Sequence, residues 1–330
     1  MFNGKVILVT GGTGSFGKKF VSTVMERYKP AKLIVFSRDE LKQFEMQQVY
    51  NDIKGDPIRY FLGDIRDKDR LYRAFEGVDI IVHAAALKQV PALEYNPFEA
   101  VQTNIIGAQN IISAAIDKKV KKVIVLSTDK AVAPANLYGA TKLCMEKLFI
   151  SANSYAGSHV TRFSAVRYGN VVGSRGSVIP LFLKQKENGK FTVTDKRMTR
   201  FWITLDEGVK LVLNGLKLMK GGEIFIPKIP SAKMIDICTA ISPECKIDII
   251  GIRPGEKLHE TLIPEDEARN TYDGGDYYIV YSPTMPPANG NSRKKRVPEG
   301  FIYSSDRNDQ WLSPSDIQNI ITKEKINMNV

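Results

Sequence analysis

Short apolar runs alternate with stretches of helical periodicity through the first half of the chain. The apolar runs have the length and composition of strands buried on both faces of a sheet, and they lie at 6–9, 33–36, 59–62, 78–82 and 123–126. Helical patterns follow the first run and recur at 41–50 and 98–116. Strands and helices that alternate in this way form right-handed βαβ crossovers. The pattern predicts an α/β fold with a doubly wound parallel sheet of the Rossmann type.

The second half of the chain has a less regular pattern. One more strand is expected to end in RYGNV at 167–171, and a closing helix is expected at 315–321. Between them, 281–298 is dominated by Pro, Asn, Ser and Lys, which predicts a long loop. We therefore expect a smaller mixed α/β domain in this half.

Composition narrows the class of protein. The chain has 330 residues, of which 43% are hydrophobic and 25% charged, as in globular proteins. No apolar run approaches the ~20 residues of a membrane span, and the first strand begins too early to leave room for a signal peptide, so we expect no membrane partner. Cys144, Cys238 and Cys245 lack metal-ligand spacing, which predicts a reducing, cytoplasmic location without disulfides. The three histidines are scattered, so no metal site is expected.

The net charge of +11 raises the question of nucleic acid. The basic residues are spread along the chain, and only RKKR at 293–296 forms a dense run. That run has no interleaved aromatic residues, so we do not expect a nucleic-acid partner. An anionic small substrate, such as a nucleotide sugar, accounts equally well for basic pockets.

The segment TGGTGSFG at 10–17 lies between the first strand and the helical pattern that follows it. Its glycines fit G-x-x-G-x-x-G, a relative of the dinucleotide-binding fingerprint, in which glycine permits a tight turn and close approach to a pyrophosphate. The N-terminus of the following helix offers free N–H groups to phosphates. The alternative is a glycine-rich turn without a ligand. The candidate cofactor residues here are Gly11, Thr13, Gly14, Ser15, Phe16 and Gly17.

The end of the second strand bears on the choice between NAD and NADP. Ser37 and Arg38 stand first there, and a guanidinium suits the 2′-phosphate of NADP, so NADP is favoured. The alternative is a solvated Arg38 with Asp39 selecting NAD. Later strand ends add candidate contacts to the cofactor, namely Asp64, Ile65, Ala84, Ala85 and Ala86. Lys88 follows at the edge where ligands bind in such sheets.

The fifth strand is followed by residues suited to acid–base chemistry. Tyr138 and Lys142 form Y-x-x-x-K, an i,i+4 pair that shares one helix face. Lys142 is expected to hold a ribose and favour the phenolate of Tyr138, whose pKa must fall by ~2–3 units from ~10 for it to act as a base near neutrality. The pattern Y-x-x-x-K alone is common in proteins. It indicates a catalytic site here because it occurs together with the glycine-rich fingerprint and the strand-end Ser127 and Thr128.

These motifs resemble those of the extended short-chain dehydrogenase/reductase superfamily. More narrowly, SRDELKQFE, HAAALK, LSTDKA, NLYGATKL, RYGNVVGSRGSV, TRFWIT, GGEIFIPKIP and IGIRPGEKLHE resemble the C5-inverting UDP-N-acetylglucosamine 4,6-dehydratases of pseudaminic acid biosynthesis. The blocks span roughly 5–262, with a weaker echo at YSSDRNDQW. The sequence departs from the family pattern at Gln89, where histidine is usual, and at Ala133, where asparagine is usual.

The resemblance implies a division of catalytic labour. Tyr138 acts on the C4 hydroxyl with Thr128 hydrogen-bonding to it, Lys130 removes the C5 proton, and Asp129 assists loss of the C6 oxygen. If Lys130 is the base, the site must lower its pKa from ~10.4. Epimerases of this superfamily usually carry small or hydroxyl residues at these two positions, so the added acid–base pair favours elimination. The alternative for Asp129 and Lys130 is a surface ion pair at a strand end.

The resemblance also implies a substrate side and a domain division. A UDP-sugar is expected to contact Lys88, Asn170, Arg200, Arg253 and Glu256, with the arginines on the diphosphate and Glu256 on the uridine ribose. We place an NADP-binding Rossmann domain at 1–168, to which later segments return, and a mainly substrate-binding region at 169–330. Family members are homo-oligomers, often hexamers, so a homo-oligomer is expected.

Two other classes of function remain open at this point. Within enzymes, the alternative is a retaining nucleotide-sugar dehydratase or a 4-epimerase. Outside enzymes, it is a non-catalytic NADP-sensing module, which would have no use for the intact set Asp129, Lys130, Tyr138 and Lys142.

Overall fold

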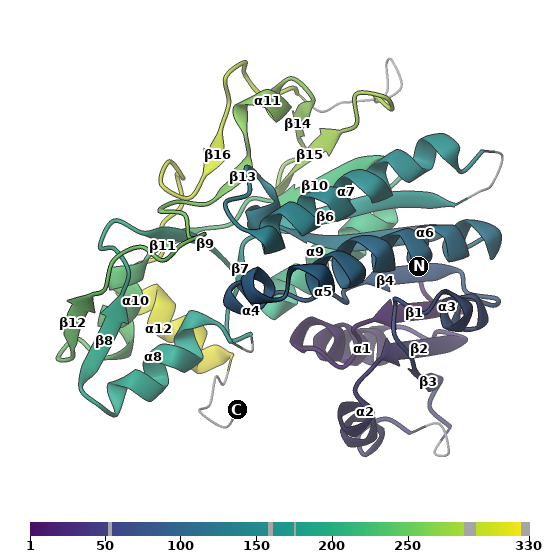
Figure 1. The fold of residues 1–330 in the computed structure, drawn as a ribbon, viewed down its shortest axis with the longest axis horizontal. Coiled ribbons are helices and arrows are strands. Elements are labelled where there is room, and N and C mark those ends of the chain that lie inside the picture. The colour runs from purple at the N-terminus through teal and green to yellow at the C-terminus, as the bar shows by residue number, and fades with distance from the viewer. Residues whose placement is uncertain (52–54, 158–160, 175, 287–294, 325–330) are drawn as a thin grey trace.

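The fold is organised on one large sheet, shown in Figure 1. The computed structural model describes residues 1–51, 55–157, 161–174, 176–286 and 295–324. Nine strands lie in the order β14-β15-β10-β6-β5-β4-β1-β2-β3. Their bounds are β1 Val6–Thr10, β2 Lys32–Ser37, β3 Ile58–Leu62, β4 Ile80–His83, β5 Lys122–Thr128, β6 Arg162–Tyr168, β10 Glu223–Pro227, β14 Thr271–Asp273 and β15 Tyr277–Tyr281. In the spatial order of the sheet, neighbouring strands between β10 and β3 pair in parallel. The strand β15 pairs antiparallel with both β10 and β14. The predicted doubly wound parallel sheet is confirmed.

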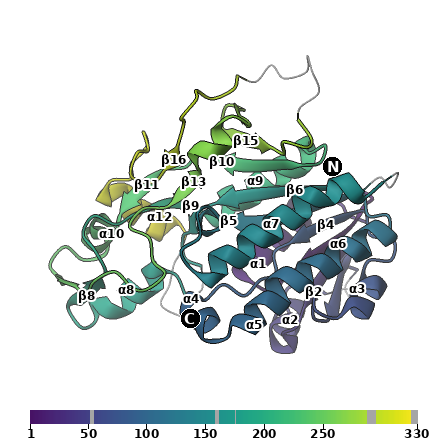
Figure 2. The ribbon, with the colours of Figure 1, turned by 45° about the horizontal axis from the view of Figure 1, so that its top comes forward.

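Helices cover both faces of this sheet, as Figure 2 shows. On one face, α1 (Ser15–Arg27) packs against α9 (Leu205–Leu218). On the other face, α3 (Lys68–Ala74), α6 (Gly107–Asp117) and α7 (Leu137–Tyr155) pack side by side. Both faces of the parallel strands are therefore buried, which is why these strands are continuous apolar runs in the sequence.

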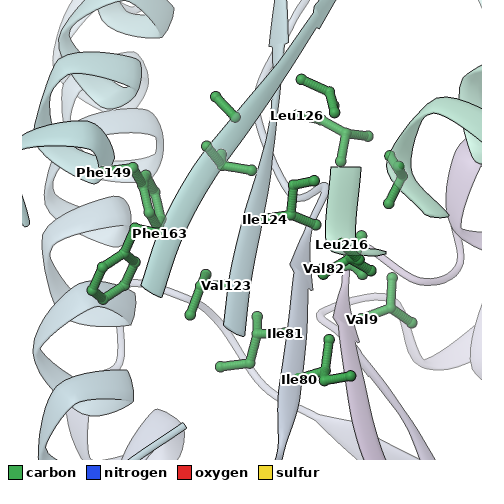
Figure 3. Packing of buried hydrophobic residues seen from close by; sticks show 14 of the residues in the cluster. Val9, Ile80, Ile81, Val82, Val123, Ile124, Leu126, Phe149, Phe163 and Leu216 are labelled. Atoms are coloured by element: carbon green, nitrogen blue, oxygen red, sulfur yellow. The ribbon is translucent and has the colours of Figure 1, made fainter. Parts of the chain in front are cut away.

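The core is densest where β4 and β5 meet the helices. Figure 3 shows side chains of β4 and β5 that extend to both sides of the sheet, with Phe149 of α7 on one side and Leu216 of α9 on the other. Val82, Val123 and Phe149 are fully buried. The ring of Phe149 lies 6.0 Å from that of Phe163 on β6, a usual spacing for aromatic pairs. The end of β5, where the candidate catalytic residues begin, is thereby held on both faces.

Two expected helices differ from the structure. The helix expected at 41–50 is α2 (Glu40–Gln47), which ends earlier. The helix expected at 98–116 is α5 (Pro97–Val101), a π-helical turn at Gln102–Ile106, and α6. The π-helical turn carries Asn104, whose side chain accepts from Leu87 N (2.9 Å) and donates to Leu87 O (3.0 Å) and Thr141 Oγ1 (3.0 Å). Because α4 (Val90–Tyr95) follows Leu87, Asn104 ties the loop after β4 to α7.

The chain after β6 divides between the large sheet and a second, smaller core. It returns to the large sheet with α9, β10, β14 and β15. The second core lies among α8 (Val178–Lys186), α10 (Met234–Ile241) and α12 (Pro314–Lys323), beside paired strands β8 (Lys190–Val193) and β12 (Lys246–Ile249). A three-stranded sheet joins the two cores, with β7 at Asn170–Val171, β9 at Thr199–Ile203 and β11 at Ser231–Lys233. The helix expected at 315–321 is α12, whereas the boundary after 168 stays a prediction.

The remaining elements lie near the C-terminal end of the chain. α11 (Glu265–Ala268) follows β13 (Thr261–Ile263), which pairs with β16 (Tyr303–Ser304). Part of the expected loop at 281–298, including the first half of RKKR, lies outside the described residues. No helix in the described ranges is long and apolar enough to cross a membrane. Within those same ranges, no group of three or more His, Cys, Asp and Glu side chains is arranged to hold a metal ion.

The C-terminus of α6 generates a stability prediction. Lys119 has φ +56°, Lys119 N donates to Ile116 O, and Val120 N donates to Ala115 O, which is the Schellman pattern that favours glycine. Lys119→Gly should therefore raise the free energy of unfolding by about 0.5–1 kcal/mol in urea denaturation. Lys118→Gly is the control, because Lys118 has φ −85° and should gain nothing. A Lys119→Gly variant no more stable than wild type would contradict the prediction.

Candidate active site

One cleft of about 1400 Å³ opens at the carboxyl ends of β1, β2, β4, β5 and β6. Asp129 lies behind its wall and is fully buried. All other candidate site residues line the cleft: Gly11, Thr13, Gly14, Ser15, Phe16, Gly17, Ser37, Arg38, Asp64, Ile65, Ala84, Ala85, Ala86, Lys88, Thr128, Lys130, Tyr138, Lys142, Asn170, Arg200, Arg253 and Glu256. The sheet topology brings these residues together, and their individual roles stay predictions.

The glycine-rich turn forms one end of the cleft. Gly11 has φ +65°, and a Cβ there would lie 2.8 Å from Ala85 N, so only glycine lets this turn meet the segment after β4. Gly14 precedes α1 and makes no side-chain cap, which leaves the first N–H groups of the helix to a ligand. Thr13 Oγ1 lies 2.8 Å from Ser37 Oγ and joins the turn to the end of β2. This cradle fits the pyrophosphate of a dinucleotide.

The acidic and basic side chains at the end of β2 have separate partners. Asp39 is the N-cap of α2, with Oδ1 accepting from Lys42 N (3.0 Å), and it also pairs with the Lys42 ammonium. Arg38 is half-exposed and lies 3.3 Å from Asp64 Oδ2. Although partial burial acts in the other direction, hydrogen bonds from Arg66 and the charge of Arg38 hold the pKa of Asp64 below its usual range. Both residues line the cleft, but the carboxylate of Asp39 is engaged in capping α2.

Tyr138 and Lys142 lie on the face of α7 that meets the cleft. Burial raises the pKa of Tyr138 to about 12, against the lowering effect of the Lys130 ammonium and a hydrogen bond with Thr128. Burial lowers the pKa of Lys142 to about 7, and its Nζ donates to Leu126 O (2.6 Å). The lowered phenol pKa expected from the sequence is absent in the protein alone, because burial of Tyr138 outweighs the charge of Lys130, the cation that acts on it.

Asp129 and Lys130 form a 3-10 turn directly after β5. Asp129 Oδ1 accepts from Thr128 Oγ1 (2.9 Å) and Lys130 Nζ (3.1 Å), and Lys130 Nζ also donates to Asn170 Oδ1 (3.2 Å). Asp129 is fully buried and Lys130 is half-buried in the cleft wall, so the pair is not the exposed surface ion pair of the alternative interpretation. Burial, with the Glu260 carboxylate nearby, raises the pKa of Asp129, although Lys130 opposes this.

The expected lowering of the Lys130 pKa is not found. Burial does act to lower it, but the carboxylates of Asp129 and Glu260 outweigh burial and raise the pKa of Lys130 above its ordinary value. Arg200 works in the lowering direction. In the protein alone Lys130 is therefore an ammonium, and it must transfer a proton before it can act as a base.

The candidate substrate residues lie farther along the same cleft. The guanidinium of Arg200 donates to the backbone oxygens of Thr199 (2.7 Å), Leu258 (3.1 Å) and Lys257 (2.9 Å), so its hydrogen bonds are largely internal. Arg253 is exposed and lies 3.8 Å from Glu256 Oε1. Burial and the charge of Lys130 lower the pKa of Lys88. Of these groups, the exposed Arg253 is better placed than Arg200 to meet an incoming phosphate.

Sequence reasoning missed two residues at the end of the IGIRPGEKLHE block. Glu260 is buried, and its Oε1 lies 3.5 Å from Lys130 Nζ. Lys257 lies 3.6 Å from Glu260 Oε2 and donates from Nζ to Val132 O (2.6 Å). The block itself was the only signal, because the contacts join residues more than 120 positions apart.

A buried ion cluster lies beneath the cleft. Arg167, at the end of β6, donates to both oxygens of Glu146 on α7 (2.5 and 3.1 Å) and both oxygens of Glu267 on α11 (2.7 and 3.2 Å). It also donates to Leu262 O on β13 (2.8 Å). The helix that carries Tyr138 is thereby fixed to the segment that carries Glu260.

The two departures from the family pattern have structural settings. Ala133 has φ +42°, a left-handed conformation that asparagine tolerates better than alanine. Gln89 is the N-cap residue of α4, and its Nε2 lies 2.6 Å from where a Cβ on Gly176 would stand. Gln89 therefore lies at the rim of the cleft against Gly176, whose φ of +72° favours glycine.

A glycine-rich turn beneath a helix N-terminus, with Y-x-x-x-K beyond the fifth parallel strand, defines a short-chain dehydrogenase/reductase of the extended type. The chain belongs to the polysaccharide biosynthesis protein family, whose sequence model matches residues 7–282.

Comparison with individual proteins narrows the likeness. An inverting UDP-N-acetylglucosamine 4,6-dehydratase of Campylobacter jejuni is 53% identical over 97% of this chain and 98% of that protein. A UDP-glucose 4-epimerase of Rickettsia canadensis is 43% identical over 85% of this chain and 84% of that protein. The X-ray structure of Pen from Bacillus thuringiensis has a TM-score of 0.90 and 43% identity, and the match covers 99% of this chain and 100% of that chain.

The desolvated Lys142 generates a prediction about pH and stability. In the unfolded chain it holds its proton up to pH ~10.4, whereas in the folded chain its pKa is about 7. Between these values the unfolded state binds more protons, so this lysine makes wild-type stability rise as pH increases from 7 to 10. The free energy of unfolding of Lys142→Met, relative to wild type, should therefore fall by ~1–4 kcal/mol over that range in urea titrations.

Lys147→Met is the matched control, because Lys147 lies on the same helix with an exposed side chain. Its stability difference from wild type should stay nearly constant between pH 7 and 10. A Lys142→Met curve parallel to that of the control would show that Lys142 keeps an ordinary pKa.

Proposed function

We propose that this protein is an inverting UDP-N-acetylglucosamine 4,6-dehydratase, a hydro-lyase that acts with NADP. The observation that carries the proposal is the ion pair of the buried Asp129 and the half-buried Lys130 beside Tyr138, in a chain 53% identical to such a dehydratase. The product is UDP-2-acetamido-2,6-dideoxy-β-L-arabino-hexos-4-ulose. This would be the first step of pseudaminic acid-type sugar synthesis.

The cofactor assignment is supported by the residues of the cleft. Gly11 leaves room for a pyrophosphate beside the uncapped N-terminus of α1. Arg38 and Asp39 both line the cleft, but the carboxylate of Asp39, the alternative ribose ligand, caps α2. When bound, NADP accepts the hydride from C4 of the sugar and later returns it to C6.

The protein side chains carry the protons of the proposed reaction. Tyr138, hydrogen-bonded with Thr128, must be a phenolate to take the proton of the C4 hydroxyl as this carbon is oxidised to a ketone. The Lys130 ammonium favours that form, and the positive charge of a bound oxidised nicotinamide would favour it further. The ketone acidifies the C5 proton, which Lys130 removes, and Asp129 protonates the C6 oxygen as it leaves as water. The final proton at C5 comes from solvent and arrives on the opposite face, which inverts that centre.

The pair can prepare itself for this step by one internal proton transfer. The base must be a neutral amine and the acid a protonated carboxyl. A proton that moves from Lys130 Nζ to Asp129 Oδ1 across their 3.1 Å hydrogen bond produces both forms and leaves the total charge unchanged. Burial favours such a neutral pair over separated charges.

We further propose a homo-oligomer in a cytoplasmic setting, with a UDP-sugar as the small-molecule partner. The free thiols Cys144, Cys238 and Cys245 support a reducing compartment. The rival function is 4-epimerisation, which the likeness to the Rickettsia enzyme favours. Both reactions begin with oxidation at C4, so the fate of the C6 hydroxyl separates them.

Arg38 should select NADP over NAD. Losing a hydrogen bond to a charged phosphate costs ~1.5–3 kcal/mol, so Arg38→Ala should weaken NADP binding about ten-fold or more and leave NAD nearly unchanged in fluorescence titrations. Arg66→Ala is the control, because Arg66 also pairs with Asp64 but does not line the cleft. Equal losses for the two cofactors in Arg38→Ala would refute the assignment.

Proton NMR of UDP-N-acetylglucosamine incubated with the protein and NADP in D₂O tests the reaction. We expect a C6 methyl signal and one solvent deuteron at C5, whereas an epimerase would retain the C6 hydroxyl and invert C4. Lys130→Ala should lose turnover by ~10²–10⁴-fold together with C5 exchange, yet still form NADPH in a single turnover. Tyr138→Phe should form none, because it fails at oxidation.

Tyr155→Phe is the control for these variants, since Tyr155 is exposed on the same helix. It should react as wild type does. Normal exchange at C5 in Lys130→Ala would move the base to another residue, with Asp129 as the first to test.

A further inference from the structure

Glu260 stands in the wall of the cleft without an assigned role. Only 2% of its surface is exposed, and it precedes β13 directly. Its backbone N donates to Ser305 Oγ (2.9 Å), and its backbone oxygen accepts from Ser305 N (2.8 Å). The backbone is therefore clamped on both sides, and the carboxylate points toward the catalytic pair.

The carboxylate is shared among three cations. Its Oε1 lies 3.5 Å from Lys130 Nζ and 3.9 Å from Arg200 Nε, and its Oε2 lies 3.6 Å from Lys257 Nζ. Among the described residues, Oε2 accepts no hydrogen bond, and the same holds for Asp129 Oδ2. A buried carboxylate that is left incompletely bonded in this way costs stability, so its presence calls for a functional reason.

Lys130 lies between the two carboxylates. Asp129 Oδ1 is 3.1 Å from Nζ and Glu260 Oε1 is 3.5 Å from it, while Asn170 Oδ1 accepts a third contact at 3.2 Å. These contacts fix the ammonium from three elements, namely the 3-10 turn, β7 and the segment before β13. The other charged or titratable groups acting on the pair are Arg200, Tyr138 and Lys88.

We propose that Glu260 is a positioning residue for the dehydration, which holds the Lys130 ammonium between two carboxylates and so governs how the Asp129–Lys130 pair takes up and releases its proton. The inference rests on the function proposed above. It assigns Glu260 no contact with the sugar, and its effect passes through the pair.

The electrostatics give this role a definite sign. Burial is the main cause that raises the pKa of Asp129, and the charge of Glu260 adds to it. The charge of Asp129 is the main cause that raises the pKa of Lys130, and the charge of Glu260 again adds to it. The reactive form of the pair holds one proton, with a neutral amine and a protonated carboxyl. Two apparent pKa values, which belong to the pair as a whole, bound the pH range of that form. A negative charge beside the pair moves both values upward, and its removal moves both downward.

The test is the pH profile of kcat for Glu260→Gln, which removes the charge and keeps the shape. Both limbs should move to lower pH by about one unit or more, with KM for the UDP-sugar nearly unchanged. Glu265→Gln is the matched control, because it removes the same charge five residues later from an exposed site and should leave both limbs in place. A Glu260→Gln profile with unmoved limbs, whether activity is normal or reduced, would overturn the proposal.

A second variant tests the opposite sign. Lys257→Met removes a positive charge beside Glu260, so both limbs should move to higher pH. This variant also keeps the proposal testable if Glu260→Gln does not fold. Glu260→Asp restores the charge on a shorter side chain and should return the limbs toward their wild-type positions even where kcat stays low.

Carboxyl ¹³C NMR of the substrate-free protein separates this proposal from the function it rests on. The Asp129 signal, assigned with Asp129→Asn, should titrate at lower pH in Glu260→Gln than in wild type. If wild type makes no ketosugar but this shift is present, the proposed function fails and the coupling of Glu260 to the pair stands. If the Asp129 titration is the same in both proteins, the coupling itself is refuted.

Discussion

The buried guanidinium of Arg167 is the interaction on which the rest of the site depends. It leaves the end of β6 and meets the buried Glu146 of α7, the partly exposed Glu267 of α11 and the backbone of Leu262. Removing one partner of such a cluster leaves an uncompensated buried charge, at a cost of about 3–5 kcal/mol. The helix α7 carries Tyr138 and Lys142, and the Leu262 segment carries Glu260. One guanidinium therefore holds the helix of Tyr138 at a fixed distance from the segment of Glu260.

Close packing at one glycine completes this arrangement. A Cβ on Gly139 would lie 2.1 Å from Lys130 O, so α7 rests directly on the 3-10 turn of Asp129 and Lys130. The neighbouring Tyr138 is thereby brought close to the pair, and its electrostatic coupling to Lys130 follows. The close contact of Gly139 with Lys130 thus accounts both for the position of Tyr138 and for the effect of the Lys130 charge on its pKa.

The fold was largely predictable, because parallel strands buried on both faces leave continuous apolar runs such as 33–36 and 123–126. The cleft followed from the same reasoning, since ligands gather at the carboxyl ends of these strands. The π-helical turn was not predictable, because Asn104 is held by Leu87 and Thr141, which lie 17 and 37 positions away. The raised pKa of Lys130 could not be predicted in full either, since Glu260 adds to the effect of the adjacent Asp129 and no local pattern links Glu260 to residue 130.

The clamp between Glu260 and Ser305 has a consequence for the order in which the protein matures. The strands that form the dinucleotide side lie early in the chain, and the sheet through β6 is complete in sequence by Tyr168. The backbone that carries the carboxylate beside Lys130 is held by Ser305, a residue near the end of the described chain. During synthesis, a nascent protein can thus acquire its cofactor cradle well before it can acquire chemical competence. The catalytic pair gains its full surroundings only once the segment that carries Ser305 has folded back against Glu260.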